Sequence, residues 1–150
     1  MSDFVYVTYI YTTPQKVWDA ITKPEFARRY WVHYNVSADW KPGSRWEHRH
    51  GDDSGKVLID GTVLESDPPR RMVMTWTRPD KSQEPSRVTF DIADYAPGLI
   101  CLTVTHDQLE ADPAMAASVS RGWPKVLSNL KSMLETGKIE NIWLTKGKEG

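Results

Sequence analysis

Eight residues in this chain combine large polarisable surfaces with a few polar atoms: Trp31, Trp46, His48, Met74, Trp76, Phe90, His106 and Trp123. Aromatic rings and thioethers offer area for burying an apolar ligand, and indole N–H groups and imidazole nitrogens can orient it. If they surround one cavity, these side chains would form a binding site for a planar or hydrophobic small molecule. The alternative is that they meet in the middle and simply close the core, because aromatic residues dominate burial in most domains.

The histidines also raise the question of a metal site. His48 and His50 would share one face of a strand, where His106 or Asp52 could complete a metal site, but no full ligand set accompanies them. We therefore expect neither a metal nor a cofactor. His33 stands alone and is expected at the surface.

Covalent and acid–base catalysis have weaker support. The chain lacks a G-x-S-x-G nucleophile motif, and Cys101 lies in the outward phase of its strand without an obvious base, so it is expected to be structural. His106, or Glu65 if it turns inward, could act on a bound ligand. The competing interpretation is that His106 is a buried, hydrogen-bonded histidine. An enzyme remains an alternative, and binding without catalysis is the favoured interpretation.

Composition narrows the class of protein. The 150 residues carry a net charge of −1 and a single cysteine. This is enough chain for one domain, and its field attracts neither nucleic acid nor an anionic membrane. No apolar run is long enough for a transmembrane helix, and no signal segment is evident at the N-terminus. A lone cysteine fits a reducing compartment, so we expect a cytoplasmic protein.

The elements that must position the candidates can be read from periodicity. Residues 4–12 are aromatic and β-branched and predict a strand. Thr13 and Pro14 then begin a helix at about 14–22, and a second short helix covers 25–30 and ends at Trp31. Period-two segments separated by turn residues predict six further strands in an antiparallel meander, at 36–40, 44–50, 56–66, 70–77, 86–93 and 98–106.

A long C-terminal helix follows the strands. Val126, Leu127, Leu130, Met133 and Leu134 form its apolar stripe, and Gly137 ends it. The opposite side is polar and includes Asn129. Because Pro124 is costly inside a helix, we expect a break or kink, with a short helix at about 113–120 and the main helix starting near an inward-pointing Trp123.

Together these elements predict an α+β fold: a curved seven-stranded antiparallel sheet wrapped around one long helix, in a single domain at 1–137 with a tail at 138–150. One helix cannot fill a strongly bent sheet, so a cavity is expected between them. Strand alternation turns three sets of side chains inward. These are Ile100, Leu102, Val104 and His106 at the cavity rim; Met72, Met74 and Trp76; and Val88, Phe90 and Ile92. Trp46, His48 and His50 share a face of the second meander strand.

Seven segments, in order along the chain, carry a family resemblance: TTPQKVWDAIT (12–22), FARRYW (26–31), KPGSRWEHR (41–49), GTVLESDPPRRMVMTW (61–76), PSRVTFDI (85–92), LTVTH (102–106) and GWPKVLSNLKSMLETG (122–137). With these segments the chain resembles the START/SRPBCC helix-grip superfamily, and within it the branch named for the C-terminal domain of the activator of the heat shock protein 90 ATPase. The resemblance implies an internal pocket for hydrophobic or amphipathic molecules. Its members include carriers, cyclases and co-chaperone domains.

The sequence therefore favours a protein that binds a small hydrophobic molecule between the sheet and the C-terminal helix. The alternatives are a cyclase or hydrolase that uses the same pocket, and a co-chaperone-like module with a chaperone as partner. Ile139, Ile142, Trp143 and Leu144 of the tail are expected to pack on their own domain, or to contact a second subunit in a homodimer.

Overall fold

The computed structural model describes residues 3–52 and 54–139 of the chain. Its elements, in chain order, are β1 (Phe4–Ile10), α1 (Pro14–Thr22), α2 (Pro24–Trp31), β2 (Tyr34–Ser37), β3 (Arg45–Arg49), β4 (Val57–Asp67), β5 (Arg71–Trp76), β6 (Ser86–Ala96), β7 (Leu99–Asp107) and α3 (Pro113–Thr136). This order confirms the predicted α+β architecture. Ile139 packs against the core, and the rest of the predicted tail contacts lie outside the described residues.

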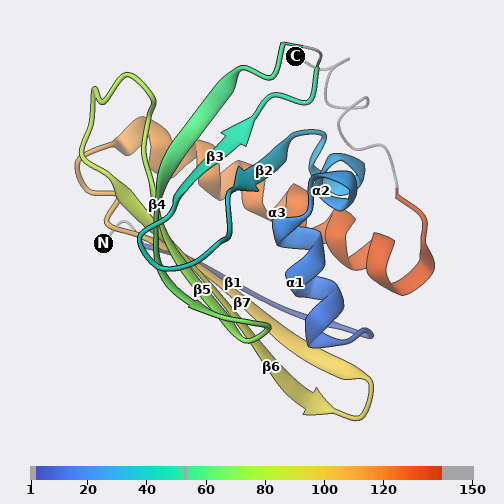
Figure 1. Ribbon diagram of the computed structural model, residues 1–150. Helices are drawn as coiled ribbons and strands as arrows, with labels where there is room; N and C mark the ends of the chain where they lie inside the picture. Colours follow the sequence, from blue (N-terminus) through green and yellow to red (C-terminus); the bar gives the residue numbers. More distant parts are fainter. Residues whose placement is uncertain (1–2, 53, 140–150) are drawn as a thin grey trace.

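All seven strands form one antiparallel sheet in the order β1-β7-β6-β5-β4-β3-β2. Strands β2 to β7 follow one another as a meander, and β1 closes the far edge by pairing with β7. The sheet bends strongly, and the three helices lie on the side toward which it curves (Figure 1). The two short helices therefore carry the chain from one edge of the sheet to the other.

Side-chain alternation along the strands builds the inner face as predicted. In β7, Ile100, Leu102, Val104 and His106 are all buried, and the residues between them are partly exposed. The predicted inward residues of β5 and β6 are buried as well. Because successive side chains of a strand point to opposite faces, the buried set of each strand is continuous with that of its neighbour.

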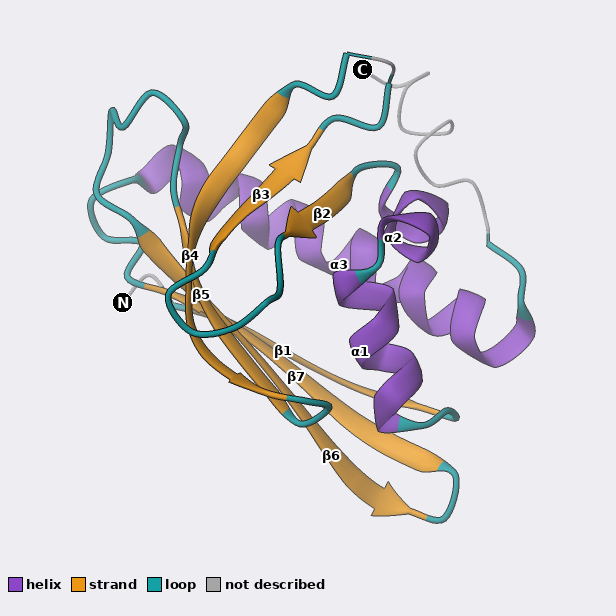
Figure 2. Ribbon diagram, viewed as in Figure 1, coloured by secondary structure: helices purple, strands orange, loops and turns teal. Residues whose placement is uncertain are grey.

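The predicted break in the C-terminal helix is wrong. Helix α3 runs without interruption through Gly122 and Pro124 (Figure 2). Its buried residues recur every three or four positions on both sides of the proline: Met115, Val119, Trp123, Val126, Leu127, Leu130 and Met133. An interior proline costs about 3 kcal/mol, and burying each large apolar side chain gains about 1.5–3 kcal/mol. The continuous apolar stripe therefore outweighs the local penalty.

Asn129 does not lie on a polar, exposed side of α3 as expected and is instead buried. Its Nδ2 donates to the backbone carbonyl of Tyr30, at 3.3 Å, which joins α3 to α2. The Tyr30 hydroxyl in turn donates to the carbonyl of Ala20, at 2.8 Å, joining α2 to α1. A buried polar group is stable when it is paired. These two hydrogen bonds connect the three helices to one another.

The N-terminal boundaries follow the predicted capping chemistry, and one strand is shifted. The Thr13 hydroxyl accepts from the backbone N–H of Lys16, and Pro14 occupies the first turn of α1. Strand β2 spans Tyr34–Ser37 rather than the predicted 36–40. Trp40 has a φ of 56°, a left-handed conformation that cannot continue a strand, and its N–H is held by the Ser37 hydroxyl.

Candidate ligand-binding site

A pocket of about 150 Å³ lies where α2, β3 and β5 face α3. Its lining consists of Trp31, His48, Trp76, Ser118, Val119, Gly122, Trp123 and Val126. Four of the eight predicted site residues are among them, and the lining contains no charged side chain. Ser118 is exposed, so this edge of the pocket faces solvent. The arrangement suits a small apolar molecule with few polar groups.

The other four candidates lie behind the pocket walls and do not line it. Trp46 packs on Trp76 with ring centroids 5.5 Å apart, and Phe90 packs on Trp123 at 5.9 Å. Met74 is buried in the same hydrophobic core cluster, and the buried His106 ring packs on Trp76 and Trp123. The structure thus brings all eight side chains into one cluster. Half of them line the pocket, and Trp46, Phe90 and His106 pack against those lining residues from behind.

His106 is completely buried and not at the rim of the pocket, where alternation had suggested it would lie. Alternation specifies the face of the sheet and not the depth of a side chain beneath its neighbours. Trp76 and Trp123 both pack edge-on against the His106 ring, at 5.3 and 6.3 Å between centroids. These two indoles separate it from the opening.

A directional chain of hydrogen bonds determines the tautomer of His106. The Ser86 hydroxyl donates to the carbonyl of Trp76 at 3.1 Å, so its only proton is used. The hydroxyl must then accept from His106 Nε2, at 2.8 Å. His106 Nδ1 is left as an acceptor for the Trp123 indole N–H, at 3.2 Å. The imidazole is therefore neutral, and each of its nitrogens has a partner.

This pairing leaves neither ring nitrogen of His106 available to a ligand in the pocket. A proton on Nδ1 would face the indole N–H, and burial lowers the pKa of His106 to about 4 despite the nearby Asp107. Glu65, the other candidate, is exposed and bound to Arg71 at 3.0 Å. Cys101 lies half-buried on the outer face of β7. None of the three presents a free catalytic group to the pocket.

A second directional chain holds His48. Asn35 Nδ2 donates to the carbonyl of Ile21 at 3.0 Å, which turns Asn35 Oδ1 toward His48 Nδ1 at 2.8 Å. Nδ1 must therefore carry the imidazole proton, and Nε2 retains its lone pair. Burial, reinforced by His33, lowers the pKa of His48 to about 3. His48 thus contributes a neutral imidazole to the pocket wall, and its Nδ1 is used in the hydrogen bond to Asn35.

His48 and His50 do not form a metal site. His50 lies beyond the end of β3, after an irregularity in strand pairing, and contacts Asp52 at 3.3 Å. His33 is partly buried between His48 and His50, rather than lying at the surface. Among residues 3–52 and 54–139, no group of three or more His, Cys, Asp and Glu is arranged to hold a metal ion.

Sequence reasoning missed the residues that orient the histidines. No local sequence pattern marks Asn35 or Ser86, because the histidines that they contact lie 13 and 20 residues away in the chain. Gly61 was also missed. The Trp46 indole crosses over it to donate to the carbonyl of Thr75 at 2.8 Å, and a Cβ on Gly61 would lie 2.7 Å from the indole nitrogen. A glycine inside a strand signals such a close approach.

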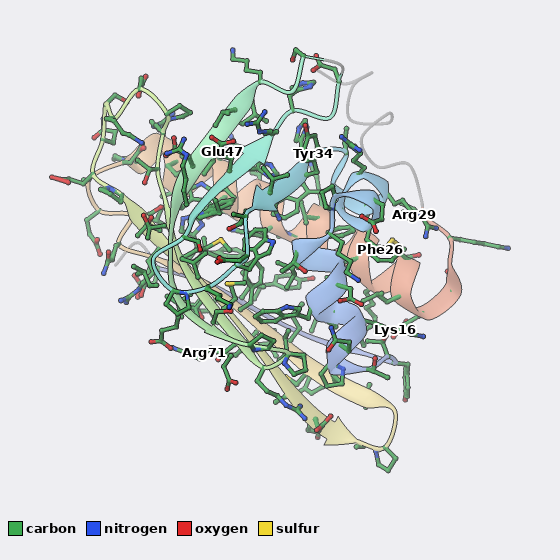
Figure 3. All side chains as sticks on the ribbon, viewed as in Figure 1. Lys16, Phe26, Arg29, Tyr34, Glu47 and Arg71 are labelled. Carbon is green, nitrogen blue, oxygen red and sulfur yellow. The ribbon has the colours of Figure 1, made fainter. Side chains whose placement is uncertain are left out.

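A second, separate pocket of about 220 Å³ lies between α1, α2 and the C-terminal part of α3. Lys16, Phe26 and Arg29 lie around it (Figure 3). Asp19 lies in its lining and forms an ion pair with Lys23 at 3.8 Å. None of the eight candidates contributes to this pocket, and its charged rim differs from the uncharged aromatic lining of the first.

Residues 11–135 match the family model described as activator of Hsp90 ATPase homolog 1-like protein. Several solved structures share the fold. Protein MLL2253 from Mesorhizobium loti is 24% identical, with 88% of this chain and 96% of that chain covered and a TM-score of 0.72. The Aha1 dimer from Colwellia psychrerythraea is 20% identical, with 92% and 99% covered and a TM-score of 0.73. An HSP90 activator from Plasmodium falciparum is 21% identical, with 88% and 95% covered and a TM-score of 0.68.

The family match confirms the resemblance stated from the sequence. At these identities the solved structures support the fold alone. A comparison with curated proteins finds no match. No described helix is both long and apolar enough to cross a membrane. The homodimer stays a prediction for this chain.

The two neutral histidines predict how stability depends on pH. Their pKa values in the folded protein lie below the unfolded value of about 6.5. The unfolded state therefore binds more protons as the pH falls, and stability is lost from about pH 6.5 downward. His106 alone accounts for a loss on the order of 3 kcal/mol by pH 4. Denaturant unfolding at a series of pH values measures the loss.

His106→Gln is the matched control. A glutamine amide can accept from Trp123 and donate to Ser86, but it does not titrate. Its free energy of unfolding should change less than that of the wild-type protein between pH 6.5 and 4. An equally steep dependence in both proteins would show that His106 is not held neutral in the fold.

Proposed function

Because this chain belongs to the family of activator of Hsp90 ATPase homolog 1-like proteins, and because a shared fold does not determine function, we propose a function from the pocket itself. The protein binds a small hydrophobic or amphipathic molecule between the sheet and α3. The observation that carries the proposal is the uncharged pocket lined by Trp31, His48, Trp76 and Trp123. The other four candidates, Trp46, Met74, Phe90 and His106, support these walls from behind.

The size of the pocket limits the ligand. A volume of about 150 Å³ equals that of an engineered apolar cavity that takes up benzene or xenon. A ligand with a single ring would be buried against three indoles, and its affinity would come mainly from the removal of apolar surface from water. For so few atoms we expect a Kd between roughly 1 μM and 1 mM. A long lipid or a polyketide of several rings would not fit without rearrangement.

The geometry supports binding better than catalysis. The enzyme alternative relied on His106 or Glu65, but neither lines the pocket. Both ring nitrogens of His106 are occupied by Ser86 and Trp123, and Glu65 is paired with Arg71. Binding requires only the existing apolar walls. The protein accordingly acts as a carrier or sensor that releases its ligand unchanged.

The proposal is tested by titrating the protein with toluene and measuring its Tm and its tryptophan fluorescence. At about ten times its Kd, a ligand specific to the folded state adds about 1.4 kcal/mol, which raises Tm by roughly 3–5 °C for a chain of this size. Gly122 lines the pocket, and no heavy atom lies within 4 Å of a Cβ built on it. Gly122→Leu should therefore fill the pocket and abolish the shift.

Ala117→Leu is the control, because Ala117 is exposed on the same helix and does not line the pocket. It should respond to toluene as the wild-type protein does. The proposal fails if neither toluene nor phenol changes the wild-type Tm and fluorescence, or if Gly122→Leu binds the ligand as well as Ala117→Leu.

The family description favours a second candidate, which is interaction with an Hsp90 chaperone. One solved structure of the same fold is that of an HSP90 activator. The readout is the ATPase rate of purified Hsp90 with a tenfold molar excess of this protein. A rise of about twofold or more, retained in Gly122→Leu, would establish an activity independent of the pocket. An unchanged rate, together with no capture of Hsp90 by the immobilised protein, would exclude this candidate.

A further inference from the structure

We propose that the pocket selects a neutral, single-ring ligand that carries a hydrogen-bond donor of the phenol type, and that Nε2 of His48 accepts this hydrogen bond. The inference rests on the proposed function, because it specifies the ligand class of the same pocket. Two independent observations carry it. One is the direction of the hydrogen bonds around His48, and the other is the chemistry of the lining.

The first observation concerns the free nitrogen of His48. The side chain is 5% exposed and lines the pocket. Asn35, oriented by the carbonyl of Ile21, holds the proton on Nδ1. No described residue donates to Nε2, yet this atom is not among the fully buried atoms without a partner. An acceptor lone pair is therefore available at the pocket surface of an otherwise buried ring.

Leaving such an acceptor unpaired against an apolar ligand is unfavourable. A purely apolar molecule would strip water from Nε2 without replacing its hydrogen bond, at a cost comparable to that of a buried unsatisfied group. A ligand hydroxyl would replace the water and gain the bond. One net hydrogen bond is equivalent to roughly a threefold to tenfold gain in affinity.

The second observation is the absence of charge. No Lys, Arg, Asp or Glu belongs to the lining of the pocket. An anionic ligand would lose its hydration without gaining a counterion, and a buried unpaired charge is strongly unfavourable. The aromatic walls could attract a cation through their ring faces, but no carboxylate in the lining would compensate its charge. A neutral ligand avoids both of these costs.

The indole donors in the lining do not reverse this preference. Trp123 gives its N–H to His106. The Trp76 N–H has no acceptor among the described residues, but it is shut off from solvent, so a ligand would reach it only after the cluster opens. Trp31 makes no hydrogen bond through its indole to a described residue, so its N–H is a second, weaker point at which a hydroxyl oxygen can accept.

A series of ligands of nearly equal size tests the proposal on the wild-type protein. Phenol donates and accepts, anisole only accepts, and toluene does neither. Benzoate and tetramethylammonium test the two signs of charge. Calorimetric titration at pH 7 should show phenol binding about tenfold more tightly than toluene, with anisole within about threefold of toluene. Benzoate and tetramethylammonium should bind at least tenfold more weakly than phenol.

A spectroscopic measurement assigns the bond to one atom. In ¹H–¹⁵N correlation spectra of the histidine rings, His48 should show a protonated Nδ1 and an unprotonated Nε2. Phenol should shift the Nε2 resonance toward that of a hydrogen-bonded nitrogen, and toluene should leave it in place. His48→Phe keeps a ring in the wall and removes the acceptor, so it should reduce the preference for phenol over toluene to about one.

The outcomes separate this inference from the proposed function. Toluene and phenol binding with equal affinity would overturn the inference and leave the proposed function intact. Tetramethylammonium binding more tightly than phenol would also overturn it. If no member of the series binds, both fail. Preference for phenol together with the His48 Nε2 shift supports both.

Discussion

Two neutral histidines inside an aromatic cluster are the constraint on which the rest of this structure depends. A buried imidazole is tolerated only when its polar atoms are paired and its charge is suppressed. His106 meets this condition through Ser86 and Trp123, and His48 meets it in part through Asn35. Because each chain of bonds has one direction, each histidine is limited to one tautomer. The difference between them is that Nε2 of His48, beside the pocket, has no hydrogen-bond partner among residues 3–52 and 54–139.

The same bonds connect the layers of the domain. Trp123 on α3 reaches His106 on β7, so the interface between sheet and helix contains a hydrogen bond as well as apolar contacts. Asn35 on β2 reaches the carbonyl of Ile21 at the end of α1. The pocket therefore lies beside side chains whose positions are set by hydrogen bonds within the fold. Preorganisation of this kind lowers the entropic cost of binding.

The sequence predicted the strands, the inward faces and the two short helices because period-two and period-four patterns follow directly from side-chain direction. Pro124 misled the prediction because its penalty is local, whereas the stripe that offsets it extends over the whole of α3. His106 was assigned to the correct face and the wrong depth. The size of the pocket could not be predicted, because a gap depends on how Trp31, Trp76 and Trp123 tilt against one another. The partners of the histidines are separated from them by 13 or more residues, and one sequence does not reveal such pairs.

The proposed function requires open space beside His48 within this aromatic cluster. Diffraction from crystals of the ligand-free protein pressurised with xenon tests it most directly, since xenon enters apolar cavities of this volume. We expect xenon density in contact with Trp31, Trp76 and Trp123. Side chains that fill the pocket, with xenon bound elsewhere or not at all, would contradict it.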